Sequence, residues 1–264
     1  MNKAVASLSV AFALVMMMFT SVAAEEHASV RILHASPDAP AVDVYVDGEL
    51  VVQELPFKEA TDDLGLPAGT YTVEVFAAGS EYVPEEAVLA TDLTVESGQE
   101  YTVAAANFLE SLEFVVAPES TEVTDGKAKI RVGHLSPDAP AVDVGIIGGD
   151  ALFTGVEFPT VTEYIEVDPG TYDLEIRLPD GTQVLPLENT ELKANTVYSV
   201  YAINSADALE VTALVDYEGA PAPGEMPVTG LGQPDQSQGL WVMALAALAV
   251  MAGGGVMLRR RFQE

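Results

Sequence analysis

The sequence predicts an all-β protein made of two tandem copies of one domain, each a sandwich of antiparallel strands. A 14-residue phrase occurs twice, as RILHASPDAPAVDV at 31–44 and RVGHLSPDAPAVDV at 131–144, with eleven identities. Apolar and polar residues alternate along short segments between turn residues, which is typical of half-buried strands. No segment between them has the period of an amphipathic helix, so strands alone are expected to build both copies.

The repeat extends well beyond this phrase. AGTYTVEV at 68–75 matches PGTYDLEI at 169–176, and YTVAAANFLESLEF at 101–114 matches YSVYAINSADALEV at 198–211. The offsets of 100, 101 and 97 residues differ only by small loop changes, as tandem duplication predicts. The 264 residues have room for two domains of about 100 residues and for further segments at both ends. We place the domains at 25–117 and 128–217, joined by a linker at 118–127.

The alternation specifies which side chains of each strand face the core. Val42 and Val44 share one face while Asp43 lies on the other, and a shift of one residue would expose the whole apolar row. About seven such strands per copy favour a β-sandwich of immunoglobulin-like or transthyretin-like type over a small open barrel. In the first copy we expect strands near 29–34, 41–47, 49–54, 70–77, 88–96, 100–107 and 112–117.

The two ends of the chain predict its location. Residues 1–24 have the layout of a secretory signal peptide, with cleavage after Ala24. Residues 239–258 are uncharged, and a helix of that length crosses a bilayer. The arginines that follow it resist translocation, so the tail 259–264 is expected in the cytoplasm and the domains outside the cell.

The segment before this span, a Pro-rich tether at 218–238, contains MPVTG and resembles a Gram-positive sorting signal of the LPxTG type. The resemblance implies that a sortase cuts after the threonine and joins it to the cell wall. The first residue departs from the family pattern, which has leucine there. The motif residues are Met226, Pro227, Val228, Thr229 and Gly230.

The charge excludes one class of partner. The chain has 11 Lys and Arg against 41 Asp and Glu, a formal net charge of −30, which repels phosphate backbones and argues against a nucleic-acid partner. Extracellular proteins and glycans remain as partners, together with the membrane that holds the C-terminal helix. No cysteine is present, so disulfides and thiolate metal sites are excluded. No cofactor is expected, and only weak, nonspecific Ca²⁺ binding by the acidic surface stays open.

The repeated SPDAP turn contains the candidate chemical groups. In the favoured interpretation His34 and Asp38 satisfy buried backbone groups at the turn, and neither copy holds a metal or a catalytic centre. The alternative is one metal site per copy, because imidazole and carboxylates suit a divalent transition metal. A serine nucleophile is disfavoured, since no nucleophile-elbow sequence surrounds Ser36. The metal candidates are His34, Asp38 and Asp43 with His134, Asp138 and Asp143.

Lys129 and Asn204 form a further, less favoured pair. Lys129 is expected on the first strand of the second copy and Asn204 on a late strand, the residue types that an isopeptide cross-link joins. A solvated lysine and a turn asparagine are the commoner explanation of the same residues.

The repeated motifs HxSPDAPxVDVYVDG, LPAGTYTVEV and EYTVAA resemble the DUF4397 family of secreted surface proteins over residues 29–217. The resemblance implies a β-sandwich and no established biochemical activity. We therefore expect a non-enzymatic protein, anchored at the outer face of the cell envelope, that serves adhesion, ligand recognition or envelope structure. The alternative is a metal-assisted envelope enzyme that uses the paired His and Asp positions.

Overall fold

The computed structural model describes residues 27–220, all within one compact unit, Met1–Gly224. The predicted signal peptide, sorting motif, membrane span and basic tail lie outside the described residues. Within 27–220, no helix has the length and apolar character that crossing a bilayer requires.

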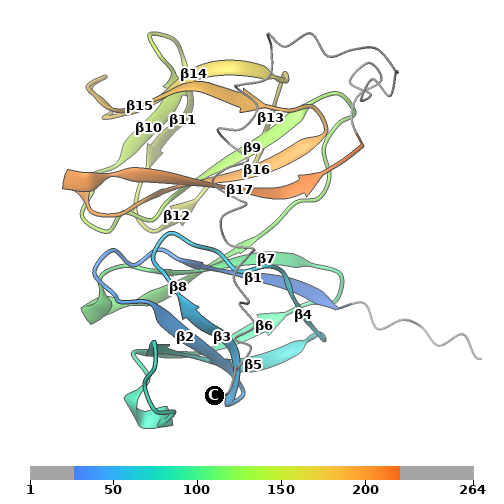
Figure 1. The fold of residues 1–264 in the computed structure, drawn as a ribbon. Coiled ribbons are helices and arrows are strands. Elements are labelled where there is room, and N and C mark those ends of the chain that lie inside the picture. Colours follow the sequence, from blue (N-terminus) through green and yellow to red (C-terminus); the bar gives the residue numbers. More distant parts are fainter. Residues whose placement is uncertain (1–26, 221–264) are drawn as a thin grey trace, which may run out of the picture. The chain divides into compact units, whose positions relative to one another are not determined.

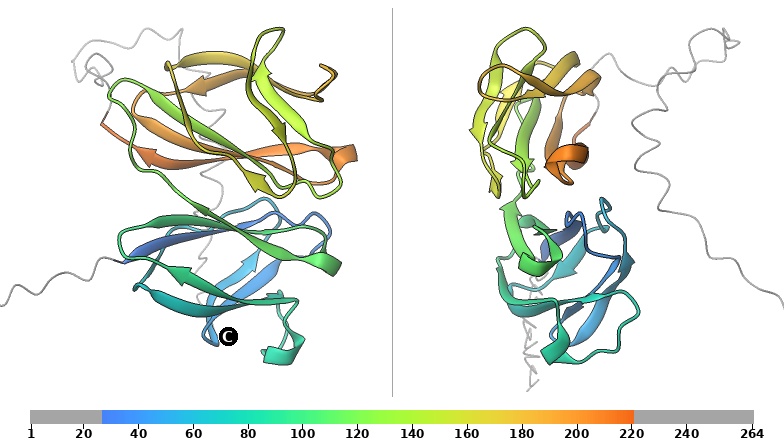
Figure 2. Two further views of the ribbon diagram at one scale, coloured as in Figure 1. Left: turned by 180° about the vertical axis from the view of Figure 1, so that it is seen from behind. Right: turned by 90° about the vertical axis from the view of Figure 1, so that its left-hand side faces the viewer.

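The first copy consists of two open four-stranded sheets around a common apolar core (Figures 1 and 2). One sheet has the order β4-β1-β7-β8, formed by Leu64–Leu66, Ala28–His34, Glu100–Ala106 and Glu113–Pro118. The other has the order β3-β2-β5-β6, formed by Glu49–Leu55, Val42–Val46, Gly69–Ala77 and Leu89–Val95. Two short 3₁₀ turns, η1 and η2, are Pro84–Glu86 and Leu109–Ser111.

The second copy repeats this arrangement. One sheet has the order β12-β9-β16-β17, formed by Thr160–Val161, Ala128–His134, Thr196–Ile203 and Glu210–Glu218, and β13, Ile165–Val167, also pairs with β9. The other has the order β11-β10-β14-β15, formed by Ala151–Val156, Val142–Ile146, Gly170–Arg177 and Gln183–Leu192. The 3₁₀ turn η3 is Ala206–Ala208. The all-β prediction is confirmed for the described residues.

The residues that the alternation predicts to face inward are buried in the core. Val42 and Val44 of β2 and Val73 and Val75 of β5 are all buried in the first core, and β1 contributes Val30 to the same cluster. One strand of the first copy escaped prediction. β4 has only three residues, one of them a glycine, which is too short for a period of two to be recognised.

The prediction of purely antiparallel sheets was wrong for one pair in each copy. β1 pairs with β7 in parallel, with Ile32 opposite Val103, and β9 pairs with β16 in parallel, with Val132 opposite Val200. Turn signals in a sequence specify hairpins between successive strands, which are antiparallel. The parallel pair joins strands that are about 70 residues apart in the chain, so no local turn in the sequence predicts it.

A third apolar cluster joins the two copies. The outer faces of β1 and β7 contribute Leu33 and Ala104. The second copy contributes Leu135, which directly follows β9, and Tyr201 of β16, which is 1% exposed. Gly133 lies beside the tyrosine, and a Cβ built there would come within 2.4 Å of the ring. The central strands β1, β7, β9 and β16 are therefore covered on both faces, once in their own copy and once against the other.

We predict that Leu135→Asp uncouples the sandwiches without unfolding either. An unpaired carboxylate in this cluster is costly to bury, whereas each sandwich keeps its own core. Calorimetry should resolve one unfolding transition for the natural chain and two for the variant. Leu50→Asp, at a position 42% exposed, is the control and should keep one transition. A single transition in both variants would contradict the coupling.

Candidate functional site

The histidine of the repeated phrase bridges the two ends of its turn. His34 ends β1 and is fully buried. Its Nε2 lies 2.9 Å from the carbonyl oxygen of Pro40, to which it donates, and its Nδ1 accepts from the backbone N–H of Ser36 at 3.3 Å. These two bonds use both ring nitrogens and require a neutral imidazole with the proton on Nε2.

The second copy makes the same bonds. His134 Nε2 lies 3.0 Å from the carbonyl oxygen of Pro140, and Nδ1 accepts from the N–H of Ser136 at 3.4 Å. Burial lowers the pKa of both His34 and His134 below the ordinary value, because a charged imidazole would lose its hydration.

The aspartate of the turn holds a second segment. Asp38 Oδ1 accepts from the N–H of Leu109, the first residue of η2, at 2.7 Å. Asp138 Oδ1 accepts from the N–H of Ala206, the first residue of η3, also at 2.7 Å. Each carboxylate thereby ties the turn after the first strand to the segment that follows the parallel strand, β7 or β16.

The next aspartate shapes an edge strand instead. Asp43 Oδ1 accepts from the N–H of Glu54 at 2.7 Å and its Oδ2 from the N–H of Gly79 at 2.9 Å. Asp143 Oδ1 accepts from the N–H of Gly155 at 2.7 Å. Glu54 and Gly155 have φ of 53° and 60°, so the carboxylate stabilises an unusual backbone conformation where the register of each edge strand shifts.

The structure therefore gives the six candidate metal ligands separate backbone partners rather than a common centre. Within residues 27–220, no three His, Cys, Asp or Glu side chains are grouped as a metal site would need. Lys129 and Asn204 also have different partners. The lysine Nζ donates to Ser120 Oγ and to the Glu122 carbonyl oxygen, both at 2.8 Å, while the Asn204 amide donates to Glu210 at 3.0 Å.

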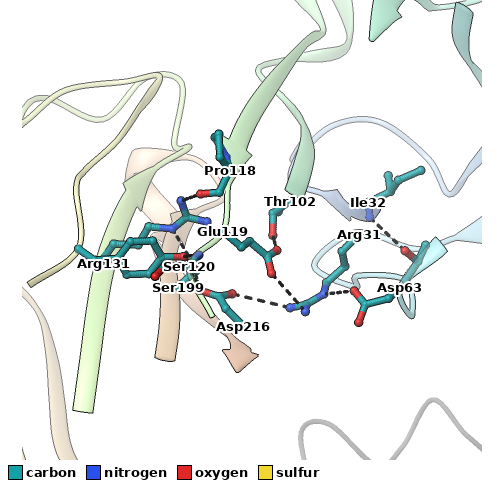
Figure 3. Close-up of polar contacts among 12 residues, drawn as sticks. Arg31, Ile32, Asp63, Thr102, Pro118, Glu119, Ser120, Arg131, Ser199 and Asp216 are labelled. Carbon is teal, nitrogen blue, oxygen red and sulfur yellow. Dashed lines mark hydrogen bonds and ion pairs between the residues drawn. The ribbon is translucent and has the colours of Figure 1, made fainter. Parts of the chain in front are cut away.

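A polar network between the two copies was not predicted (Figure 3). Arg31 of β1 lies 3.7 Å from the carboxylate of Glu119 and 3.9 Å from that of Asp216, and its Nε donates to Asp63 at 3.4 Å. Thr102 of β7 donates to Glu119. Glu119 was assigned to the linker, but its side chain is 2% exposed and belongs to this contact.

The second copy contributes the matching half of this network. Arg131 Nε donates to Ser199 Oγ at 2.6 Å, and Nη1 donates to the carbonyl oxygen of Pro118 at 2.6 Å. Ser199 Oγ and the hydroxyl of Tyr164 donate to Asp216 Oδ2 at 2.5 and 2.7 Å. The guanidinium of Arg131 lies over the Tyr164 ring at 4.5 Å, a cation–π geometry.

The two halves occupy equivalent positions of the repeat. Arg31 and Arg131 are 100 residues apart, whereas Thr102 and Ser199, like Glu119 and Asp216, are 97 apart. The network thus resembles the contact of a symmetric dimer, formed here within one chain. Burial raises the pKa of the Glu119 and Asp216 carboxyls. The signal that could have revealed this contact is YTVAAA, a strand that is apolar on both faces.

We predict that the two buried histidines make the protein less stable as the pH falls. The folded-state pKa is lowered, so the unfolded chain takes up protons first, and stability that is complete above the unfolded value of about 6.5 declines as the pH falls toward the folded value. The slope is at most about 1.4 kcal/mol per pH unit for each histidine.

The matched control is the double variant His34→Gln and His134→Gln, whose amides do not titrate. Urea unfolding of both proteins at pH 7.5 and pH 5 gives the difference, in which the carboxylates common to both cancel. Equal pH dependence in the two proteins would show that the histidines do not act in this way.

Comparison with known proteins gives one family and several solved structures. The model of a family described as a domain of unknown function, DUF4397, matches residues 28–145 and 146–231. Among curated proteins, none matches the chain. The two matched segments meet inside β10, whereas the sheets divide the chain between β8 and β9.

The solved structures are distant. The TIE protein of Bacillus anthracis is 16% identical, with a TM-score of 0.23, and the match covers 75% of this chain and 32% of that one, so the chain spans about a third of its length. A proposed cell adhesion protein of Bacteroides uniformis is 13% identical, with a TM-score of 0.23 and coverage of 71% and 96%. One from Bacteroides fragilis is 11% identical, with a TM-score of 0.20 and coverage of 71% and 97%.

The family match covers both copies of the repeat and more than half of the chain. The chain therefore belongs to the DUF4397 family and contains this domain in tandem.

Proposed function

We propose that this protein is a non-enzymatic component of the cell surface, in which two coupled sandwiches form one module for adhesion, ligand recognition or envelope structure. The observation that carries the proposal is the use of the repeated turn. The histidine and the two aspartates of each copy are hydrogen-bonded to backbone groups of their own sandwich. The duplicated residues therefore stabilise the turn in each sandwich.

The contact between the sandwiches suits a module that transmits force or presents a surface. Two sandwiches joined only by a linker would move independently. Here the apolar cluster and the polar network restrain them, and the first residues after β8 are part of that restraint. We propose that the module behaves as one stiff body and that the tether at 218–238 supplies the reach from the envelope.

The mode of attachment rests on the sequence alone. We propose export by the signal peptide, retention by the span at 239–258, and sortase-mediated transfer of Thr229 to the cell wall. We further assign each sandwich to the immunoglobulin-like or transthyretin-like class, and we propose an extracellular protein or glycan as the ligand. The acidic composition, with a net charge of −30, favours an uncharged or basic partner.

The location is tested by labelling intact cells with an amine reagent that does not cross membranes. The natural chain should be labelled, whereas a control variant lacking residues 1–24 should stay unlabelled in the cytosol. Thr229→Ala should move the protein from the wall fraction to the membrane fraction if a sortase acts on the motif. Recovery of the natural chain from the cytosol would contradict the proposal.

The absence of enzymatic chemistry is tested by comparing the natural chain with His34→Gln and His134→Gln on envelope glycans, with and without added divalent metal. We expect neither protein to release products, and we expect both to give the same profile on an array of glycans and extracellular proteins. Hydrolysis that the double variant loses while it remains folded would establish the enzyme instead.

A further inference from the structure

An apolar cavity of about 170 Å³ lies between the two sheets of the first sandwich. Val30 and Val103 line it from one sheet, and Val73 and Leu93 line it from the other. No charged or hydrogen-bonding side chain is part of its wall. Water inside it would find no side-chain hydrogen-bond partner, and its lining atoms forgo the dispersion contacts that close packing would give them.

The second sandwich is an internal reference, because its strands pair in the same way. A pocket of about 20 Å³ lies in it, lined in part by residues equivalent to those of the large cavity, such as Val132 and Val200. At three positions that line the large cavity, Val30, Val51 and Val73, the second copy has the larger residues Ile130, Leu152 and Leu174. Other lining positions differ in the opposite direction, for example Ile32, Leu66 and Phe114, which correspond to Val132, Val167 and Val211. The fold itself therefore does not require the large cavity.

The cavity is reached from the edge of the sandwich. β3 and β4 are edge strands of their sheets, and their lining residues Val51, Leu64 and Leu66 are only partly buried. A small molecule can enter between these two strands without separating the hydrogen-bonded pairs in the middle of either sheet. Val30 and Val73 are 2–3% exposed and lie at the closed end.

We propose that the first sandwich binds a small, uncharged, apolar molecule in this cavity. A dry cavity of about 150 Å³ accommodates benzene, so this one fits a six-membered ring or a branched hydrocarbon of similar size. Charged molecules are excluded because the lining offers no partner for a charge. The second sandwich, with its small cavity, does not bind the same probe. This site is independent of the proposed surface location.

The test uses benzene and the full chain, with ¹³C-labelled methyl groups of Val and Leu followed by NMR. Benzene should shift the methyl signals of Leu64, Leu93 and Val103 and leave those of Leu174 unchanged. The variant Val30→Ile with Val73→Leu imports the residues of the second copy and should weaken binding at least tenfold. Leu174→Val is the matched control away from the cavity and should bind as the natural chain does. Benzylammonium should produce no shift at these methyl groups.

Three results would overturn the proposal: no methyl shifts at saturating benzene, equal binding by the natural chain and the filled variant, or equal shifts in both sandwiches. If the double variant fails to fold, Val73→Leu alone decides the matter, because the equivalent strand already contains leucine at position 174. A gain in thermal stability of the filled variant, without benzene, would show in addition that the added methyl groups occupy the cavity.

Discussion

The sandwich architecture depends on a buried imidazole that bridges a turn. β1 and β2 follow each other in the chain but belong to different sheets, so the turn between them crosses from one layer to the other. His34 spans that crossing, with one nitrogen bonded to Ser36 and the other to Pro40. Because proline fixes φ and the ring is fully buried, the crossing has little freedom left. The identical bonds in the second copy show why the whole phrase occurs twice.

A second constraint acts between the copies. The facing sheets meet through residues of unequal size at equivalent positions, for example Ala35 and Leu135, or Ala106 and Ile203. At these two positions the first copy supplies the small side chain and the second the large one, whereas Leu33 of the first copy corresponds to Gly133 of the second, so two faces of common origin fit each other. Arg31 of β1 then meets the buried carboxylates of Glu119 and Asp216, and removing one partner would leave a charge without compensation. Arg131, at the matching position of β9, bonds to Ser199, which in turn donates to Asp216.

The sequence was sufficient to predict the features that depend on local residue patterns. The alternation of Val42 and Val44 with Asp43 identified the core face, and the repeated phrase identified the two domains. The features that could not be predicted depend on contacts between residues far apart in the chain. The parallel pairing of β1 with β7 has no hairpin signal, and Arg31 in a strand resembles an ordinary exposed residue until the other copy covers it. The burial of Glu119, within the predicted linker, depends on distant residues in the same way.

Gly133 also affects which strands can pair, because equivalent strands of the two copies could in principle exchange partners. β1 and β9 occupy equivalent positions of the repeat, and each has a parallel neighbour, β7 or β16. In the native pairs Leu33 lies opposite Ala104, and Gly133 lies opposite Tyr201. A leucine opposite the tyrosine would occupy the space of its ring, because even a Cβ there approaches to 2.4 Å. Side-chain volume thus discriminates against the exchange of β1 for β9 beside β16.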